Sequence, residues 1–226
     1  MQYGQTIEGV FLARPNRFIA HVEVDGETRI CHVKNTGRCR ELLEDGARVI
    51  LEKTNNPARK TLYDVIAVYK GDRLINMDSQ APNRVFKEWL EEGHGFPNLT
   101  RIQPECRYQN SRFDFYLEAD GRPTFVEVKG VTLEENGVVL FPDAPTERGV
   151  KHINELIEAV QQGYDAYIFF VVQMEDCDYF TPNRATHPAF ADALRRAAQS
   201  GVHIRAVNCH VSENTLAIGD YVKVVL

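Results

Sequence analysis

The feature that most constrains the fold of this chain is a pair of apolar segments that carry three functional charges between them. The segments are 112–117 (RFDFYL) and 125–130 (FVEVKG), and the turn-forming stretch ADGRP at 119–123 lies between them. This spacing predicts a β-hairpin, in which successive side chains point to opposite faces. We therefore expect Asp114 to point away from Phe113 and Phe115, and Glu127 and Lys129 to share one face of their strand.

These three charged residues are suited to phosphodiester hydrolysis. Asp114 and Glu127 would supply carboxylate oxygens to a hard divalent cation, and the carbonyl of Val128 would supply a third oxygen. The ammonium group of Lys129 would orient or deprotonate the attacking water. Burying such charges on a strand is costly unless something pairs them, which favours a functional site. The alternative is a structural ion cluster on a solvated strand face.

Composition indicates an ordinary soluble protein. With 226 residues and 43% hydrophobic content, the chain can form one large or two small domains. No apolar run is long enough to cross a bilayer and the N-terminus lacks an export signal, so we expect a cytoplasmic protein with no membrane partner. The five scattered cysteines lack a C-x-x-C motif, and the histidines lack helical zinc spacing. Glycine-rich nucleotide-binding motifs are also absent from the sequence.

The net charge of −6 argues at first against a nucleic-acid partner, but the charge is unevenly distributed. Residues 1–82 carry 12 Lys and Arg against 11 Asp and Glu, whereas residues 83–226 carry 14 against 21. Two basic groups stand out in the first part: Lys34, Arg38 and Arg40, and Lys53, Arg59 and Lys60. Either group would contact phosphates if the fold places it on one surface, and the alternative is a solvated face.

Residues 1–81 are predicted to form a small β-rich domain. An Asp25-Gly26 hairpin turn lies between two apolar runs, and one or two helical turns are expected at 38–43. Strands are expected at 7–12, 18–24, 30–33, 49–53, 62–69 and 74–77. This order is typical of a five-stranded OB barrel, a fold that often binds single-stranded nucleic acid or oligosaccharides. The fold alone establishes neither function.

Residues 82–226 are predicted to form an α/β domain, with the boundary near Ala81. Apolar residues at helical spacing predict a long amphipathic helix at 146–162, which must cover a sheet. The continuous apolar run at 166–172 predicts a strand buried on both faces. Further helices are expected at 84–92 and 188–199, and strands at 104–108, 138–141 and 203–207, with a closing hairpin at 215–218 and 221–225.

A mixed sheet with Asp and Glu-x-Lys on adjacent strands, followed by a crossover helix, resembles the PD-(D/E)XK nuclease superfamily. The chain as a whole resembles the sugar fermentation stimulation protein A (SfsA) family. This resemblance rests on HVKNTGR at 32–38, SRFDF at 111–115, EVKGVTL at 127–133 and FPDAPTERGVKH at 141–152. It implies an OB-like β-barrel domain at 1–81, a restriction-endonuclease-like mixed sheet flanked by helices at 82–226, and DNA binding.

The resemblance also implies roles for individual residues. Asp114 and Glu127 would bind Mg²⁺ or Mn²⁺, and Lys129 would be the catalytic ammonium. A Glu on the helix before the site strands often adds a ligand in the superfamily. Glu88 is the best match, with Glu91 or Glu92 as alternatives, and a solvent-exposed carboxylate is the competing interpretation.

Helix 146–162 would contribute further polar residues to this site. Arg148, Lys151 and His152 are spaced to project to one side of the helix and contact phosphate. Lys151 would also be the helix-borne group beside the attacking water, whereas Asp143 and Thr146 would serve only to cap the helix. Together with the strand residue Arg112, the predicted nucleic-acid contacts are Lys34, Arg38, Arg40, Arg112, Arg148, Lys151 and His152.

The sequence therefore predicts a two-domain DNA-binding protein with a metal-dependent nuclease site. One alternative is a non-catalytic, non-specific DNA-binding regulator linked to sugar metabolism, and another is an oligosaccharide-binding OB module. The choice between single- and double-stranded DNA stays open. An exposed strand near the C-terminus would allow a homodimer.

Overall fold

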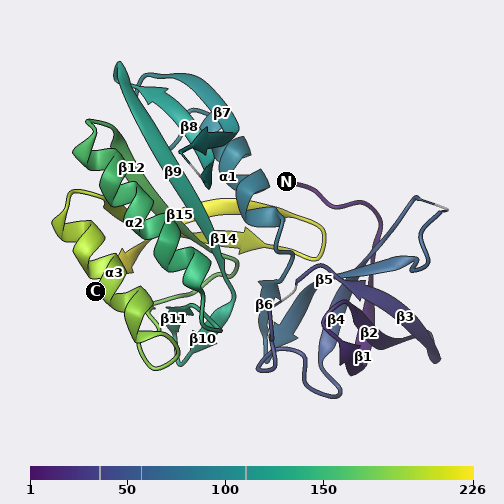
Figure 1. The fold of residues 1–226 in the computed structure, drawn as a ribbon. Helices are drawn as coiled ribbons and strands as arrows, with labels where there is room; N and C mark the ends of the chain where they lie inside the picture. Colours follow the sequence, from purple (N-terminus) through teal and green to yellow (C-terminus); the bar gives the residue numbers. More distant parts are fainter. Residues whose placement is uncertain (36, 57, 110) are drawn as a thin grey trace.

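The computed structural model describes residues 1–35, 37–56, 58–109 and 111–226, which form a small β-barrel beside a larger α/β part (Figure 1). The barrel sheet has the order β3-β2-β1-β4-β5-β6, and a parallel pairing between β3 and β5 closes it. This arrangement confirms the predicted OB barrel. Its strands are β1 (Thr6–Asn16), β2 (Ile19–Val24), β3 (Glu27–Val33), β4 (Arg48–Lys53), β5 (Tyr63–Lys70) and β6 (Arg73–Asn76).

The short helix expected at 38–43 is replaced by turns. Cys39 has a φ of 45°, in the left-handed region, and the amides of Leu42 and Leu43 both donate to its carbonyl. The guanidinium of Arg14 donates to the carbonyls of Gly37 and Arg38 at 2.9 and 2.7 Å. A helix would need those carbonyls for its own ladder, so Arg14 stabilises the turn conformation instead.

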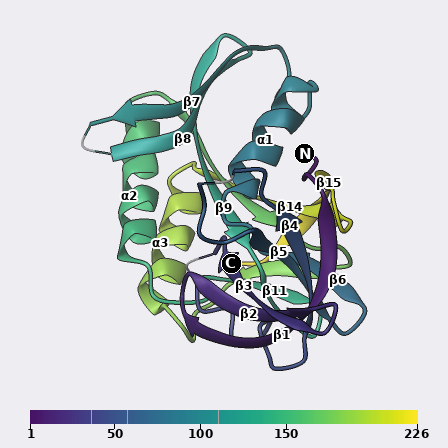
Figure 2. The same ribbon diagram turned by 90° about the vertical axis from the view of Figure 1, so that its right-hand side faces the viewer.

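The α/β part is built on one mixed sheet with the order β10-β11-β13-β15-β14-β12-β9-β8-β7. Helix α1 lies on one side of this sheet, and α2 and α3 lie together on the other (Figure 2). The helices are α1 (Ala81–Glu91), α2 (Glu147–Gln161) and α3 (Pro188–Gln199). The strands are β7 (Leu99–Tyr108), β8 (Ser111–Ala119), β9 (Arg122–Val131), β10 (Leu133–Glu135), β11 (Val138–Phe141), β12 (Asp165–Val172), β13 (Tyr179–Pro182), β14 (His203–Val211) and β15 (Leu216–Val224).

Two strands of this sheet, β12 and β15, match or correct the sequence analysis. Strand β12 is buried on both faces, as its apolar run predicts. The expected hairpin at 215–218 and 221–225 is instead the single strand β15, which pairs antiparallel with β14. Gly219 and Asp220, which separate the two expected strands, lie at an irregularity in this pairing, where the Asp220 amide donates to Asn208 Oδ1 at 2.6 Å.

None of the helices in the described ranges is both long and apolar enough to cross a membrane.

Strand β8 rotates along its length, so that two aromatic residues expected on one face lie on opposite faces of the sheet. Phe115 packs against Phe86 of α1, with ring centroids 5.3 Å apart. Phe113 packs against Phe125 and His152 on the α2 side, at 5.2 and 6.3 Å. Asp114 lies between them in the chain, next to the end of the regular pairing of β8 with β9.

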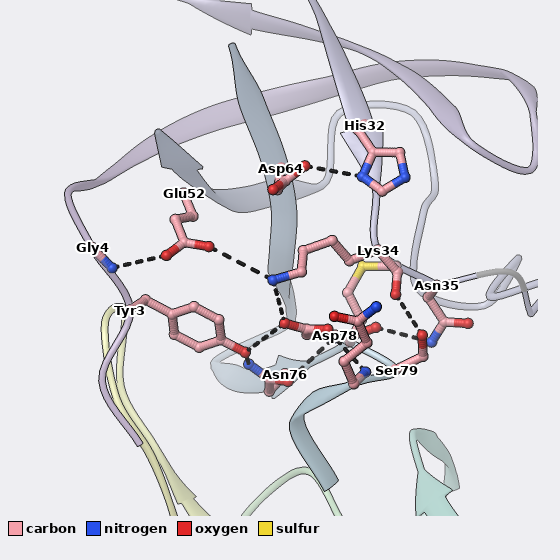
Figure 3. A network of polar contacts seen from close by, with 12 residues as sticks. Tyr3, Gly4, His32, Lys34, Asn35, Glu52, Asp64, Asn76, Asp78 and Ser79 are labelled. Atoms are coloured by element: carbon pink, nitrogen blue, oxygen red, sulfur yellow. Dashed lines mark hydrogen bonds and ion pairs between the residues drawn. The ribbon is translucent and has the colours of Figure 1, made fainter. Parts of the chain in front are cut away.

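A buried polar network joins the barrel to the α/β part, and Figure 3 shows its barrel side around Lys34, Asn76 and Asp78. Lys34 Nζ lies 2.7 Å from Asp78 Oδ2, and Asp78 is 2% exposed. The side-chain amide of Gln173, beyond the end of β12, donates to Asn76 Oδ1 at 2.8 Å and to the Asp78 carbonyl at 3.0 Å. Because these contacts are short and shielded from water, they fix the barrel relative to the sheet.

Gly130, the residue after Lys129, lies at this junction. A Cβ atom at this position would come within 2.6 Å of both Gln173 Oε1 and Pro82 Cγ. We therefore expect Gly130→Ala to lower the free energy of unfolding by about 1–3 kcal/mol through overpacking, as measured by urea denaturation. Gly4→Ala is a suitable control, because its Cβ would meet only Glu52 Oε1 at 3.5 Å, an ordinary contact. Equal stabilities for the two variants would contradict this prediction.

Candidate active site

A cleft of about 300 Å³, here called the site cleft, opens where the first turns of α1 and α2 face strands β8 and β9. Both helices direct their N-termini toward it. Because unpaired amide groups and the helix macrodipole favour anions at such ends, the cleft is suited to a phosphate group. Its lining residues are Ser79, Pro82, Asn83, Asp114, Glu127, Val128, Lys129, Gly130, Phe141, Thr146, Arg148 and Gly149.

Asp114 lies where β8 separates from β9. The regular pairing of these strands reaches Phe115 and Val126 and goes no further. Beyond that point the Asp114 carboxylate replaces the backbone ladder, because its Oδ2 accepts a hydrogen bond from the Val128 amide at 2.8 Å. Burial, together with the negative charge of Glu127, raises the pKa of Asp114 above its usual value.

Glu127 is 2% exposed and its two carboxylate oxygens have different environments. Oε1 accepts hydrogen bonds from Lys129 Nζ and from His152 Nδ1. Oε2 is buried and has no hydrogen-bond partner among the described residues. Burial opposes ionisation of Glu127, but the bond from His152 and the charge of Lys129 outweigh it and lower the pKa. The carboxylate is thus ionised, anchored through one oxygen and unpaired at the other.

The donor set of the site cleft fits a hard divalent cation. Asp114 and Glu127 supply carboxylate oxygens from adjacent strands. The Val128 amide points to Asp114, and the amide and carbonyl of one strand residue point to the same side, so the Val128 carbonyl also faces the gap between β8 and β9. The described residues contain no group of three His, Cys, Asp or Glu side chains able to hold a metal. A bound ion would therefore complete its shell with carbonyl oxygens and water, as Mg²⁺ commonly does.

The ligand predicted on the preceding helix is corrected by the structure. Glu88 pairs with the N-terminal ammonium of Met1 at 2.6 Å and with Arg84 at 3.3 Å, and it does not line the site cleft. The residue that α1 brings to the site is Asn83, whose Nδ2 donates to Asp114 Oδ1 at 2.8 Å. Sequence reasoning missed Asn83 because it searched this helix for a carboxylate. A polar residue in the first helical turn would have been the better criterion, since that turn faces the site strands.

The three polar residues of α2 do not project to one side. Arg148 lines the site cleft, and its Nε lies 3.4 Å from His152 Nε2. His152 is 4% exposed and holds Glu127, which corrects its predicted role as a phosphate contact. Lys151 is exposed, lies 3.7 Å from Glu155 and is not part of the cleft lining, which corrects its predicted place beside the attacking water. Thr146 caps the helix, accepting from the Gly149 amide at 3.0 Å.

The remaining predicted nucleic-acid contacts are spread over several surfaces. Arg38 and Arg40 are exposed in the turns after β3. Arg112 is exposed on β8 and pairs with Glu105 at 3.2 Å. The Lys34 side chain is 20% exposed and pairs with the buried Asp78. Lys34 therefore belongs to the polar network that joins the barrel to the α/β part. Within the Lys34, Arg38 and Arg40 group, Arg38 and Arg40 are exposed and Lys34 is half-buried.

The raised pKa of Asp114 has a consequence for stability. A carboxyl group whose pKa is raised in the folded state stabilises the fold below its unfolded pKa, and this contribution is lost as pH rises through the folded pKa. At neutral pH without metal, Asp114→Asn should therefore raise the melting temperature. Asn83 can rotate its amide to keep a hydrogen bond.

Adding metal should reverse the order of the melting temperatures, so that the wild type becomes more stable than Asp114→Asn. At 100-fold excess over the dissociation constant, an ion that binds only the folded state adds about 2.7 kcal/mol to the wild type. Asp114→Asn should gain almost no stability from the ion. The wild-type gain should also grow as pH rises and Asp114 ionises. Thermal melts at several pH values with and without Mn²⁺ measure both effects, and equal metal-induced shifts in the two proteins would contradict the assignment.

Models of known protein families match both halves of the chain. A family model described as the SfsA N-terminal OB domain matches residues 12–77, and one described as the sugar fermentation stimulation protein RE domain matches residues 80–215. A Desulfitobacterium hafniense protein (strain DSM 10664 / DCB-2), named sugar fermentation stimulation protein homolog, is 61% identical over 226 residues. That alignment covers 100% of this chain and 99% of the relative.

Two further relatives extend the comparison. A sugar fermentation stimulation protein homolog of Clostridium beijerinckii is 55% identical over 226 residues, with 100% of both chains covered. Among solved structures, that of Pyrococcus furiosus SfsA in complex with Ca²⁺ matches with a TM-score of 0.87 and 27% sequence identity. The match covers 100% of this chain and 98% of the archaeal chain.

Proposed function

The chain belongs to the sugar fermentation stimulation protein (SfsA) family, and from that premise we propose that it is a DNA-binding, Mg²⁺- or Mn²⁺-dependent nuclease. The observation that carries the proposal is the state of Glu127. This carboxylate is ionised, is anchored through Oε1 by Lys129 and His152, and keeps Oε2 buried without a partner. Such an orphaned oxygen is costly in a purely structural ion cluster, whereas a metal ligand requires it.

The archaeal relative supports the same interpretation. Its structure was solved in complex with Ca²⁺, a hard cation with the same preference for oxygen ligands as Mg²⁺. In the present chain, Asp114, Glu127 and the Val128 carbonyl would hold the ion. Asn83 and His152 would orient the two carboxylates, because each donates a hydrogen bond to one of them.

In this mechanism, the bound cation would polarise a nonbridging phosphate oxygen and lower the pKa of a water molecule. Lys129, as a charged ammonium, would position that water and stabilise the hydroxide that forms from it, and the released proton would pass to the solvent. Arg148 and the N-termini of α1 and α2 would bind the phosphate oxygens and stabilise the charge that develops on them. In-line attack by the water would then expel the 3′ oxygen.

A second candidate function is non-catalytic DNA binding in a regulatory role. It is favoured by the direct contact between Lys129 and Glu127, because two opposite charges that neutralise each other can serve structure alone. In that case the carboxylates would contribute to folding, and the basic side chains would hold DNA.

Incubation of the purified protein with end-labelled single- and double-stranded DNA separates the two candidates. The proposal predicts cleavage with Mg²⁺ or Mn²⁺ and none with EDTA. Salt-sensitive binding without cleavage in either metal would refute the nuclease and support the regulator.

A further inference from the structure

A second and larger hollow, here called the barrel cleft, lies on the β-barrel and has a volume of about 750 Å³. Three segments of the barrel surround it: the turn between β1 and β2, the end of β3, and the loop between β4 and β5. Its lining residues are Phe18, Ile19, His32, Val33, Lys34, Arg59, Lys60, Thr61, Asp64, Ser79 and Gln80. The metal-dependent reaction proposed above gives this cleft no role.

The barrel cleft carries an unpaired cation although the whole chain is acidic. Its lining contains Lys34, Arg59 and Lys60 against the carboxylate of Asp64, and Lys34 is paired with Asp78 and Glu52, at 2.7 and 3.7 Å. Asp64 is neutralised within the cleft, since Arg59 donates to it at 2.7 Å and His32 Nδ1 lies 2.9 Å away. Lys60 is exposed and has no ion-pair partner among the described residues. The lining therefore has positive charge available for an anionic ligand.

The cleft also presents an aromatic surface. Phe18 is 44% exposed, which is unusual for a large apolar side chain unless it contacts something. The guanidinium of Arg17 lies 4.8 Å from the centre of its ring. An exposed aromatic face next to cations is the combination that binds unpaired nucleic-acid bases, because a base stacks on the ring while its phosphate contacts the cation. A base inside a duplex is already stacked on both faces and cannot make this contact.

The barrel cleft adjoins the site cleft. Ser79 lines both of them. Its amide and hydroxyl both donate to the Lys34 carbonyl, at 3.0 and 2.7 Å, and Lys34 is itself fixed by Asp78 (Figure 3). The relative position of the two clefts is therefore set by the short hydrogen bonds of Ser79 and by the ion pair of Lys34 with the buried Asp78, and an extended strand that passes Ser79 would enter both clefts.

We propose that the barrel cleft binds a single-stranded segment of nucleic acid that continues into the site cleft, so that the substrate is unpaired next to the cleaved bond. This inference rests on the proposed nuclease function and specifies its substrate. Phe18 stacks a base, Lys60 contacts a phosphate, and Ser79 lies on the path between the two clefts.

Fluorescence anisotropy in EDTA, with labelled single-stranded DNA and a blunt duplex of the same sequence, tests this proposal without catalysis. Phe18→Ala should weaken binding of the single strand by about 10-fold, the value expected for one stacked base, and leave duplex binding nearly unchanged. Lys60→Glu should weaken single-strand binding and reduce the slope of log K against log salt by about one, the value expected for one lost phosphate contact. Tyr221→Ala and Lys223→Glu, exposed positions on β15, are the matched controls and should bind normally.

The outcomes separate this inference from the nuclease proposal. If Phe18→Ala loses equal affinity for single strand and duplex, or loses none, the proposed binding of a single strand in the barrel cleft is wrong even if metal-dependent cleavage occurs. Selective loss of single-strand binding would support the path. If that loss is found in a protein that cleaves nothing in any metal, the nuclease proposal fails and the barrel cleft remains a binding site.

Discussion

Lys129→Ala is expected to lower the rate of metal-dependent DNA cleavage by about 10²–10³-fold, the range typical of losing one group that stabilises developing charge. The reason is local: Lys129 lines the site cleft, it is the cation on the same strand face as Glu127, and its ammonium contacts that carboxylate. Binding should change far less, because the barrel cleft and Arg148 keep their positive charges.

The measurement is single-turnover cleavage of end-labelled DNA, paired with anisotropy to record the binding constant. Lys87→Ala is a matched control, because Lys87 is exposed on α1 and its ion pair with Glu91 bridges one helical turn on the surface. We expect it to cleave like the wild type. Retention of full activity by Lys129→Ala would remove the amine from the mechanism, and a parallel loss of binding would indicate a purely electrostatic contribution.

Glu127→Gln is expected to lower the free energy of unfolding by about 3 kcal/mol and to abolish cleavage, because it breaks a buried ion pair on one side. The partly exposed Lys129 and the buried His152 would then share an uncharged oxygen. The substitution preserves the shape of the side chain, so the loss reflects charge and not a cavity.

The loss of stability caused by Glu127→Gln should become smaller as pH falls. Since the pKa of Glu127 is lowered in the folded state, its stabilisation is fully present above the unfolded pKa near 4.3 and is lost as pH falls through the folded value. The difference between wild type and Glu127→Gln should therefore be large at pH 7 and shrink in acid. Urea denaturation at both pH values measures it.

Glu118→Gln is a matched control for this substitution. Glu118 pairs with Arg101 at 3.1 Å, but both side chains are substantially exposed, so the loss should stay below about 1 kcal/mol. A similar small loss for Glu127→Gln at pH 7 would mean that the buried carboxylate is not ionised in the folded protein.

Much of the fold could be predicted because local patterns agree with the tertiary structure. The apolar run of β12, the helical periodicity of α2 and the Asp25-Gly26 turn each lead to the observed element. Where prediction failed, a long-range contact decides the structure. Arg14 draws backbone carbonyls away from the helix expected at 38–43, and Asn208 binds the amide of Asp220 within β15. Neither partner is near in sequence.

The candidate site could be predicted in part for the same reason. The sequence could group Asp114, Glu127 and Lys129 because they lie on two strands, β8 and β9, that are consecutive in the chain and pair with each other, although the expected alternation fails at Phe113. The residues contributed by helices depend on where each helix crosses the sheet, and sequence periodicity does not encode that. Hence α1 delivers Asn83 in place of Glu88, and α2 turns His152 inward to Glu127.

The most direct test of the central claim is a crystal structure of the protein soaked in MnCl₂, with anomalous scattering recorded to locate the ion. The account predicts an anomalous peak in the site cleft about 2.1 Å from Glu127 Oε2 and from the Asp114 carboxylate, the distance expected for a small divalent cation bound by oxygen. A well-ordered site cleft with no peak, or a peak held by other residues while Glu127 Oε2 stays unliganded, would contradict it.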